Sequence, residues 1–138
     1  MNISLEENLS ALDPRLEANK KTVLAFYEAG LINKDFDAAS KFIGERYVQH
    51  NPLIADGIEG FKAFVNYLKK TFPHLRGEIK KIFADGDFVI LHAHGVRVPG
   101  QAGSAIVDIF RLENGKIVEH WDVMQPIPED ALNQNGMF

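Results

Sequence analysis

A change in the spacing of apolar residues at Pro73 is the sequence feature that most restricts the fold. Before Pro73, apolar residues recur every three to four positions, which indicates amphipathic helices. After Pro73, β-prone runs alternate around Asp85-Gly86 and Asn114-Gly115, two pairs typical of tight hairpin turns. The sequence therefore predicts an α+β fold, with three N-terminal helices packed on a strongly curved, mainly antiparallel sheet that encloses a cavity.

Turn-forming residues and helix caps suggest where the elements begin and end. Asp13-Pro14 is typical of a helix start, and Gly30 is expected to end this first helix. We expect two further helices, over 35–43 and 58–72, separated by an irregular link that contains Pro52. The chain is expected to form one domain over 1–138, in which 1–12 is a loose N-terminal arm and 127–138 a C-terminal tail.

Composition excludes several classes of partner. The 138 residues carry a net charge of −4, and their Lys and Arg residues are scattered, so we expect neither nucleic acid nor a membrane surface as a partner. Cysteine is absent, which excludes disulfides and thiolate metal sites and fits a reducing cytoplasm. We find no signal peptide and no apolar run of the ~20 residues that a membrane span needs. These features predict a cytoplasmic protein.

The last predicted strand carries polar residues on a face that is otherwise apolar. Successive strand residues point to opposite faces, so His120 and Asp122 share a face with Val118 and Met124, whereas Trp121 faces the other way. A solvated face would carry Lys, Thr and Glu instead of Val and Met. The alternation therefore indicates that His120 and Asp122 line a pocket.

The pairing of the last two strands decides whether Asp108 joins this pocket. A two-residue turn would place Arg111 on the face of His120, unless a bulge shifts the phase by one residue. A three-residue turn with Gly in the left-handed conformation would pair Asp108 with His120 and Phe110 with Val118. We favour the three-residue turn because it keeps Arg111 out of the core.

The stretches VDIFRLENGKIVEHWDVMQPIPE (107–129) and YVQHNP (47–52) resemble the SnoaL-like polyketide cyclase family. This family belongs to the nuclear-transport-factor-like superfamily, which also contains ketosteroid isomerase. The resemblance covers about residues 16–126 and is strongest to a branch described as predicted aldol-condensation enzymes. It implies a conical sheet around the cavity, and a homodimer packed through the outer sheet face that carries Trp121.

The resemblance also implies roles for the residues of the last strands. By motif position, Asp122 corresponds to the acid/base of an intramolecular aldol ring closure that needs no metal or other cofactor, and His120 to the His two residues before it. Asp108 replaces a pocket His of the characterised cyclases, which changes the charge of the site. As a hypothesis, Asp122 acts as base and then acid, His120 orients it or polarises the carbonyl, and Asp108 sets the tautomer or shares a proton.

Several other polar and aromatic residues could contact a substrate in the cavity. We expect this role for the following residues: His50, Asn51, His92, His94, Phe110, Tyr27 and Met124. Each of them also has an ordinary structural explanation, since His and Tyr in strands and helices commonly belong to the core. The spacing His92-x-His94, together with His120, Asp122 or His50, is a weaker indication of a three-ligand zinc or iron site.

Three functions therefore stay open from the sequence. The leading one is a cofactor-independent cyclase or isomerase that acts on a small carbonyl compound. The second is a ligand-binding or accessory protein that uses the same cavity without turnover. The third is a metal-dependent enzyme built on His92 and His94.

Overall fold

The computed structural model describes residues 13–138 as three α-helices, a π-helical turn and five strands. The helical elements are α2 (Pro14–Tyr27), η1 (Glu28–Ile32), α3 (Phe36–Ser40) and α4 (Gly57–Thr71). The strands are β1 (Ile43–Gln49), β2 (Arg76–Asp85), β3 (Phe88–Val96), β4 (Ser104–Glu113) and β5 (Lys116–Pro126). Among the described residues, none of the helices is both long enough and apolar enough to span a membrane.

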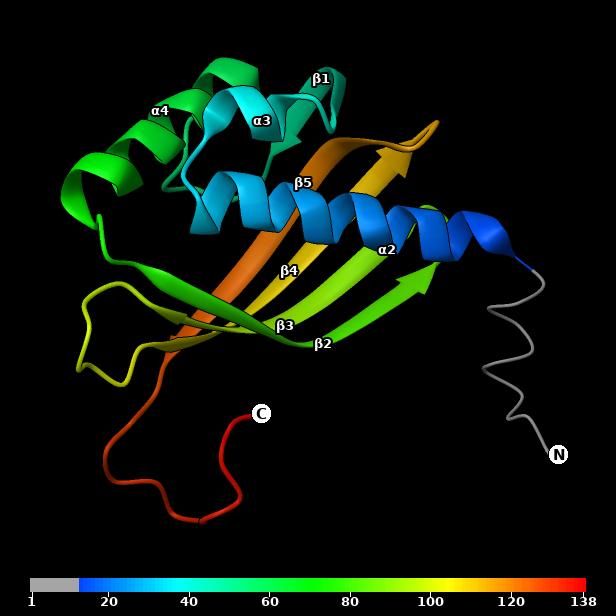
Figure 1. Cartoon of the computed structure of the whole chain (residues 1–138). Helices are drawn as coiled ribbons and strands as arrows, with labels where there is room; N and C mark the ends of the chain where they lie inside the picture. The colour runs from blue at the N-terminus through cyan, green and yellow to red at the C-terminus, as the bar shows by residue number, and fades with distance from the viewer. Residues whose placement is uncertain (1–12) are drawn as a thin grey trace, which may run out of the picture.

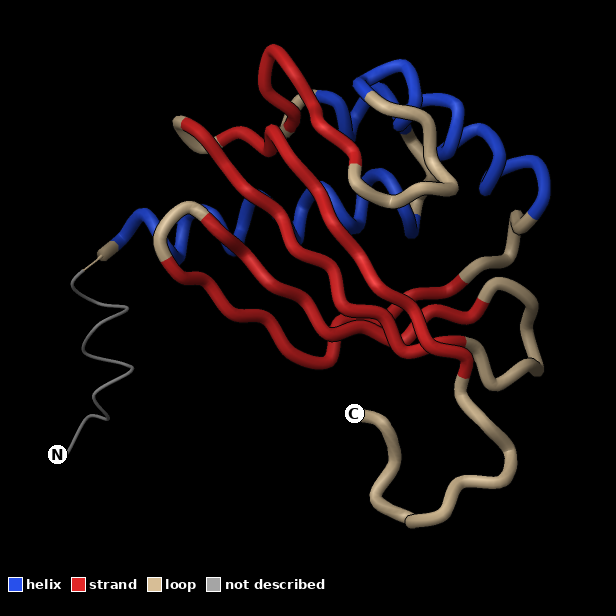
Figure 2. Tube along the Cα trace, turned by 180° about the vertical axis from the view of Figure 1, so that it is seen from behind, coloured by secondary structure: helices blue, strands red, loops and turns tan. Residues whose placement is uncertain are grey.

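The five strands form one mixed sheet whose inner face is covered by the helices. The strand order is β1-β5-β4-β3-β2; β1 runs parallel to β5, and all other neighbours are antiparallel. The helices lie together on one side of the sheet (Figure 1), and the strands are seen from the opposite side in Figure 2. The prediction of an α+β fold with three helices on a mainly antiparallel sheet is confirmed.

One strand was missed in the sequence. The link between the second and third helices was expected to be irregular, but residues Ile43–Gln49 form β1 along the edge of β5. Its alternation is hidden because the register shifts between Ile43 and Val48. Ile43 and Tyr47 are buried, whereas the residues between them are partly or fully exposed. The strand therefore has too few inward apolar residues to stand out from a loop.

The first helix begins where the sequence predicts, but its helical path continues past Gly30. The Asp13 side chain accepts a hydrogen bond from the backbone N–H of Arg15, and Pro14 occupies the first turn. Gly30 does not end the helix; it lies inside the π-helical turn η1. A Cβ at Gly30 would lie 3.1 Å from the Phe61 ring and 3.3 Å from Ala39, so a larger residue there would require these neighbours to shift slightly.

The core lies between the helical layer and the inner face of the sheet. Phe26 of α2 stacks on Phe61 of α4 with ring centroids 5.1 Å apart and meets the edge of Phe110 of β4 at 5.8 Å. Val65 of α4 and Leu91 of β3 are fully buried in the same layer. Burial of these apolar side chains supplies most of the free energy that holds the two layers together.

The β4–β5 hairpin differs from the favoured register. Asn114 and Gly115 both have positive φ angles, 50° and 76°, as a two-residue turn of the primed type requires. The pairing passes from Leu112 with Ile117 to Arg111 with Glu119, so one residue of β5, Val118, is bulged out of the ladder.

The expected three-residue turn was therefore wrong, and so was the pairing of Asp108 with His120. Instead, Asp108 pairs with Asp122 and Phe110 pairs with His120. The predicted grouping of Asp108, His120 and Asp122 on one face nevertheless holds. The bulge shifts the phase of β5 by one residue, which is the shift that the three-residue turn had been expected to supply.

The C-terminal residues form a tail that contacts the sheet. Residues 127–138 contain neither helix nor strand, and Phe138 packs against His92 and His94 with ring centroids 5.2 and 5.0 Å apart. The predicted arm over 1–12 lies outside the described residues. The tail therefore returns to the outer face of the sheet instead of extending away from it.

The close approach of the 50–56 link to α4 gives a test of the fold. A Cβ at Gly60 would overlap the carbonyl oxygen of Ala55, so Gly60→Ala should destabilise the protein by about 1–3 kcal/mol. An unstrained Gly→Ala change inside a helix stabilises instead. Urea unfolding measures the difference, with the exposed Asn66→Ala on the same helix as the control. A stability gain in Gly60→Ala would contradict this packing.

Candidate functional site

A cavity of about 320 Å³ lies between the helices and the inner face of the sheet. Five residues predicted to act on or contact a substrate line it: Tyr27, Asp108, His120, Asp122 and Met124. Most of the remaining wall is apolar, with side chains such as Phe64, Leu68 and Ile106. The titratable groups on the two last strands therefore face a largely dry space.

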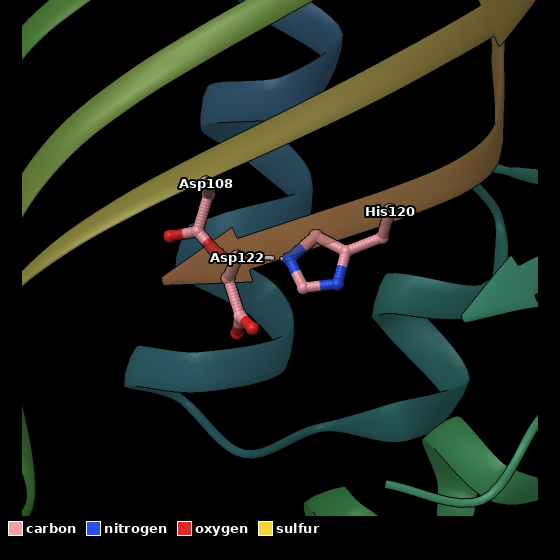
Figure 3. A group of neighbouring side chains, drawn as sticks. All are labelled: Asp108, His120 and Asp122. Carbon is pink, nitrogen blue, oxygen red and sulfur yellow. Dashed lines mark hydrogen bonds and ion pairs between the residues drawn. The ribbon is translucent and has the colours of Figure 1, made fainter. Parts of the chain in front are cut away.

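Asp108, His120 and Asp122 form a compact group on this wall (Figure 3). One ligand-type atom from each side chain lies within 4.8 Å of the others. His120 Nε2 is 2.8 Å from Asp108 Oδ1, and both side chains are buried. Asp122 is only partly buried and lies across the strand pair from Asp108. Two of the three side chains are thus buried, while the third is partly exposed.

The tautomer of His120 is fixed by Gln49. The backbone N–H of Asn51 donates to Gln49 Oε1 over 3.0 Å, which identifies this atom as the amide oxygen. The same oxygen lies 2.8 Å from His120 Nδ1. An amide oxygen only accepts, so Nδ1 carries the hydrogen. Nε2 and the Asp108 carboxyl group must then share a single proton across their 2.8 Å contact.

Burial favours the protonated form of Asp108. Desolvation raises the pKa of Asp108, and the nearby Asp122 carboxylate raises it further, while the hydrogen bond and charge of His120 lower it. The net direction is upward. A protonated Asp108 that donates to Nε2 leaves both partners uncharged, which is the least costly state in an apolar interior.

Asn51 holds Asp122 from the same link. Its Nδ2 donates to Asp122 Oδ1 over 2.8 Å, and its own Oδ1 accepts from the backbone N–H of Leu53, also over 2.8 Å. The second bond orients the amide so that the NH₂ group faces Asp122. The short stretch from Gln49 to Leu53 therefore positions both His120 and Asp122.

Two tyrosines add neutral donors to the wall. Burial, followed by the Asp108 charge, raises the pKa of Tyr27 to about 12. Burial and the charges of Asp108 and Asp122 raise the pKa of Tyr47 as well, although its hydrogen bond with Gln49 lowers it. Both phenols line the cavity and keep their protons. Each is thus a hydrogen-bond donor in a dry environment.

Sequence reasoning missed Tyr47 and Gln49. Both lie on β1 two residues apart, the spacing that places side chains on one face of a strand. Recognising YVQ as the end of a strand would have found them. Their place in a stretch rich in turn formers concealed that signal.

Five of the predicted contact residues, Asn51 among them, do not line the cavity. His50 faces outward, where its Nε2 lies 2.6 Å from Glu119 Oε2 and its ring stacks on Trp121 at 4.7 Å. Phe110 is buried beneath the His120 ring, with centroids 4.9 Å apart, and supports it from the core. The expectation that these two residues line the cavity was wrong.

His92 and His94 lie on the opposite face of the sheet. Leu91, their neighbour on β3, pairs with Asp108 and is fully buried on the inner side. Alternation then turns both His residues outward, where they contact Phe138. The alternative interpretation of a metal site built on His92, His94 and His120 was therefore wrong, because the sheet separates the first two from the third.

Asp108, His120 and Asp122 are the residues with metal-ligand geometry in the described chain. One carboxylate oxygen from each Asp and one imidazole nitrogen could serve as ligands. Both ring nitrogens of His120 already have hydrogen-bond partners, and no buried side-chain polar atom of the described residues lacks one. A cation would have to displace the proton shared by His120 and Asp108.

The raised pKa of Asp108 gives a pH-dependent prediction. A carboxyl group whose folded-state pKa exceeds its unfolded value of about 3.9 stabilises the protein below that value, and the stabilisation is lost as pH rises through the folded pKa. The neutral side chain of Asp108→Asn does not titrate. Urea unfolding from about pH 4 to about pH 8 should therefore show wild type losing stability relative to this variant. A constant difference would contradict the assignment.

Comparisons with known proteins place this geometry in context. The family model described as SnoaL-like polyketide cyclase matches residues 21–128. A search of curated proteins gave no match. Several solved structures share the fold at low identity.

A putative SnoaL-like polyketide cyclase from Jannaschia sp. CCS1 is 23% identical, with a TM-score of 0.65 over 81% of this chain and 88% of that one. An NTF2-like protein of unknown function from Cytophaga hutchinsonii is 25% identical, with a TM-score of 0.62 over 78% and 90% of the two chains. AclR, a putative hydroxylase from Streptomyces galilaeus, is 23% identical, with a TM-score of 0.65 over 80% and 90%. Because the family model matches most of the chain, the chain belongs to the SnoaL-like polyketide cyclase family.

Proposed function

We propose that this protein is an enzyme that moves a proton next to the carbonyl group of a small compound, without a cofactor, in an aldol or enolisation reaction. One observation carries the proposal: three titratable side chains meet on the wall of a mostly apolar cavity, and of these only Asp122 is partly exposed. Acid/base chemistry needs such a division between a reachable base and a group that retains its proton.

Asp122 is the proposed base. Asn51 occupies one of its carboxylate oxygens, and no other described residue makes a hydrogen bond with this side chain. The second oxygen is available to take a proton from the carbon next to a carbonyl group. In an aldol closure the enolate carbon then bonds to a second carbonyl carbon, and Asp122 returns the proton to the new alkoxide oxygen.

The pair of Asp108 and His120 is proposed to keep the site neutral while this charge moves. A second carboxylate beside Asp122 would oppose formation of an enolate, because like charges repel strongly in a dry cavity. The shared proton removes that charge. The phenol of Tyr47 or Tyr27 could then donate to the enolate oxygen, since both line the cavity with their protons retained.

Removing the proposed base should stop proton transfer. Wild-type protein in D₂O should exchange the protons between the carbonyl groups of 1,3-diketones or 3-oxo esters, and Asp122→Asn should reduce this rate by about 10²–10⁴-fold. The exchange is followed by proton NMR. The thermal midpoint should change little, because Asp122 is only partly buried.

Asp85→Asn is the matched control, since it removes an exposed carboxylate at the end of β2 and should leave the exchange rate unchanged. Equal exchange by wild type and Asp122→Asn would contradict the proposed base. If neither exchanges protons but both bind these compounds, the protein is a ligand-binding member of the family.

We also propose that two copies pack through the outer face of the sheet. This face carries a shallow apolar groove lined by Phe88, Ile90, Val107, Ile109, Trp121, Asp122 and Val123. Val123 of β5 is 69% exposed and Phe88 of β3 is 40% exposed, and exposed apolar side chains gathered on one face of a sheet mark a contact surface. A second copy would remove this surface from water.

A charge in this groove should separate the two copies. Val123→Asp should shift the mass measured by light scattering from that of a dimer to that of a monomer, since an unpaired carboxylate would be buried in the contact. Leu53→Asp, a similar change at an exposed residue of the 50–56 link, should remain dimeric. A wild-type protein that is monomeric would contradict the proposed contact.

A further inference from the structure

The mouth of the cavity carries the opposite charge from its floor. Asp108 and Asp122 supply carboxyl groups at the floor, beside His120. Arg76 and Arg97 line the same cavity, but both are exposed to solvent, so they lie where the cavity opens. A ligand that fills the cavity would therefore reach from an acidic end to a basic end.

The two arginines are held on adjacent strands. Arg76 is the first residue of β2, and it pairs with Val96, the chain neighbour of Arg97. The guanidinium carbon of Arg97 lies 5.2 Å from the centre of the Phe72 ring, which follows α4. Stacking on a ring face limits the motion of a guanidinium group and leaves its N–H edge free for a ligand.

Neither arginine has its charge neutralised within the described part of the chain. No ion pair there includes Arg76 or Arg97, whereas Arg15, Arg46 and Arg111 each pair with a carboxylate. The hydrogen bonds of the described residues also leave both guanidinium groups without a side-chain acceptor. Both groups can therefore offer their donors to a ligand.

The sequence around the mouth is basic in a protein that is acidic overall. Residues 60–77 contain no Asp or Glu but include Lys69, Lys70 and His74, and residues 88–107 around Arg97 also contain no acidic residue. The whole chain carries a net charge of −4. Local excess positive charge at a cleft in low-dielectric surroundings attracts anions and raises their local concentration.

We propose that the substrate of this cavity is a carbonyl compound that also carries a small oxyanion, a carboxylate or a phosphate. The oxyanion binds Arg76 and Arg97 at the mouth, where Gln101 and Ser104 add polar groups, and the carbonyl group lies against Asp122 at the floor. Guanidinium groups bind both oxyanions through two parallel hydrogen bonds. This substrate class rests on the proposed function for the position of the carbonyl group.

Charge also fixes the direction in which such a compound enters. An oxyanion at the floor would meet the Asp122 carboxylate with no cation beside it, apart from a proton shared between His120 and Asp108. At the mouth it meets two unpaired guanidinium groups. The reversed orientation is therefore excluded by repulsion at one end as well as by lost attraction at the other.

Three probes of similar shape test the proposal by isothermal titration calorimetry in low salt. Naphthalene-1-acetate and 1-naphthyl phosphate carry the two oxyanions, and naphthalene-1-acetamide is neutral. Wild type should bind at least one anion about tenfold more tightly than the amide, since one charge-assisted hydrogen bond contributes at least that factor. The tighter of the two anions identifies the oxyanion.

The double variant Arg76→Gln/Arg97→Gln should reduce this preference to about twofold or less, because only neutral donors remain at the mouth. Arg46→Gln, which removes the same charge from an exposed position on β1, should keep it. Circular dichroism confirms that each variant is folded. A preference that persists in the double variant, or the failure of both anions to bind wild type at millimolar concentration, would overturn the proposal.

The proposed base is tested separately with Asp122→Asn. This variant should retain the preference for the anion although it has lost proton exchange. Normal exchange by Asp122→Asn together with a preference that depends on the arginines would overturn the proposed base and leave the oxyanion site standing. If Asp122→Asn loses exchange but the preference for the anion survives in Arg76→Gln/Arg97→Gln, the oxyanion site is overturned and the proposed base stands.

Discussion

One extra residue in β5 decides which side chains of that strand face the cavity. The two-residue turn at Asn114-Gly115 sets the hairpin in a register that would turn His120 and Asp122 outward. The bulge at Val118 reverses the alternation and brings both side chains to the inner face. The contact between Asp108 and His120 depends on this shift, because the two side chains can form a hydrogen bond only when both point to the inner face.

The burial of a carboxyl group then determines the rest of the chemistry. Asp108 lies in an apolar interior, where an ionised and unpaired carboxylate is strongly disfavoured. His120 and the shared proton resolve this, and Gln49 makes sure that the imidazole offers its Nε2 lone pair to that proton. Asp122, by contrast, is only partly buried. Two neighbouring carboxyl groups thus have different surroundings, one buried and one partly exposed.

Sequence reasoning was most successful where one periodicity dominates. The helix that contains Phe61, Val65 and Leu68 and the strands around both turns were predicted because burial of one face imposes a regular spacing. The inward grouping of His120 and Asp122 followed from the same rule. Beyond that rule, two stretches of the chain resemble the SnoaL-like family, and the family match confirms this membership.

Features that depend on long-range contacts were not predictable in this way. Edge strand β1 was missed because the burial of its residues follows no regular alternation, and only its pairing with β5 identifies it as a strand. His92 and His94 have the same spacing as a pair of pocket residues, and only the pairing of Leu91 with Asp108 shows that they face outward. The bulge at Val118 shifts β5 by one residue, as the expected three-residue turn would have done. The incorrect turn therefore still placed His120 and Asp122 on the correct face.

The link from Gln49 to Leu53 couples two groups that are otherwise independent. Gln49 orients His120, Asn51 orients Asp122, and the backbone N–H of Asn51 joins the two amides. No other described side chain hydrogen-bonds to Asp122. A displacement of this short segment therefore releases both side chains together. The orientation of both side chains on β5 therefore depends on one segment of five residues that is remote from them in sequence.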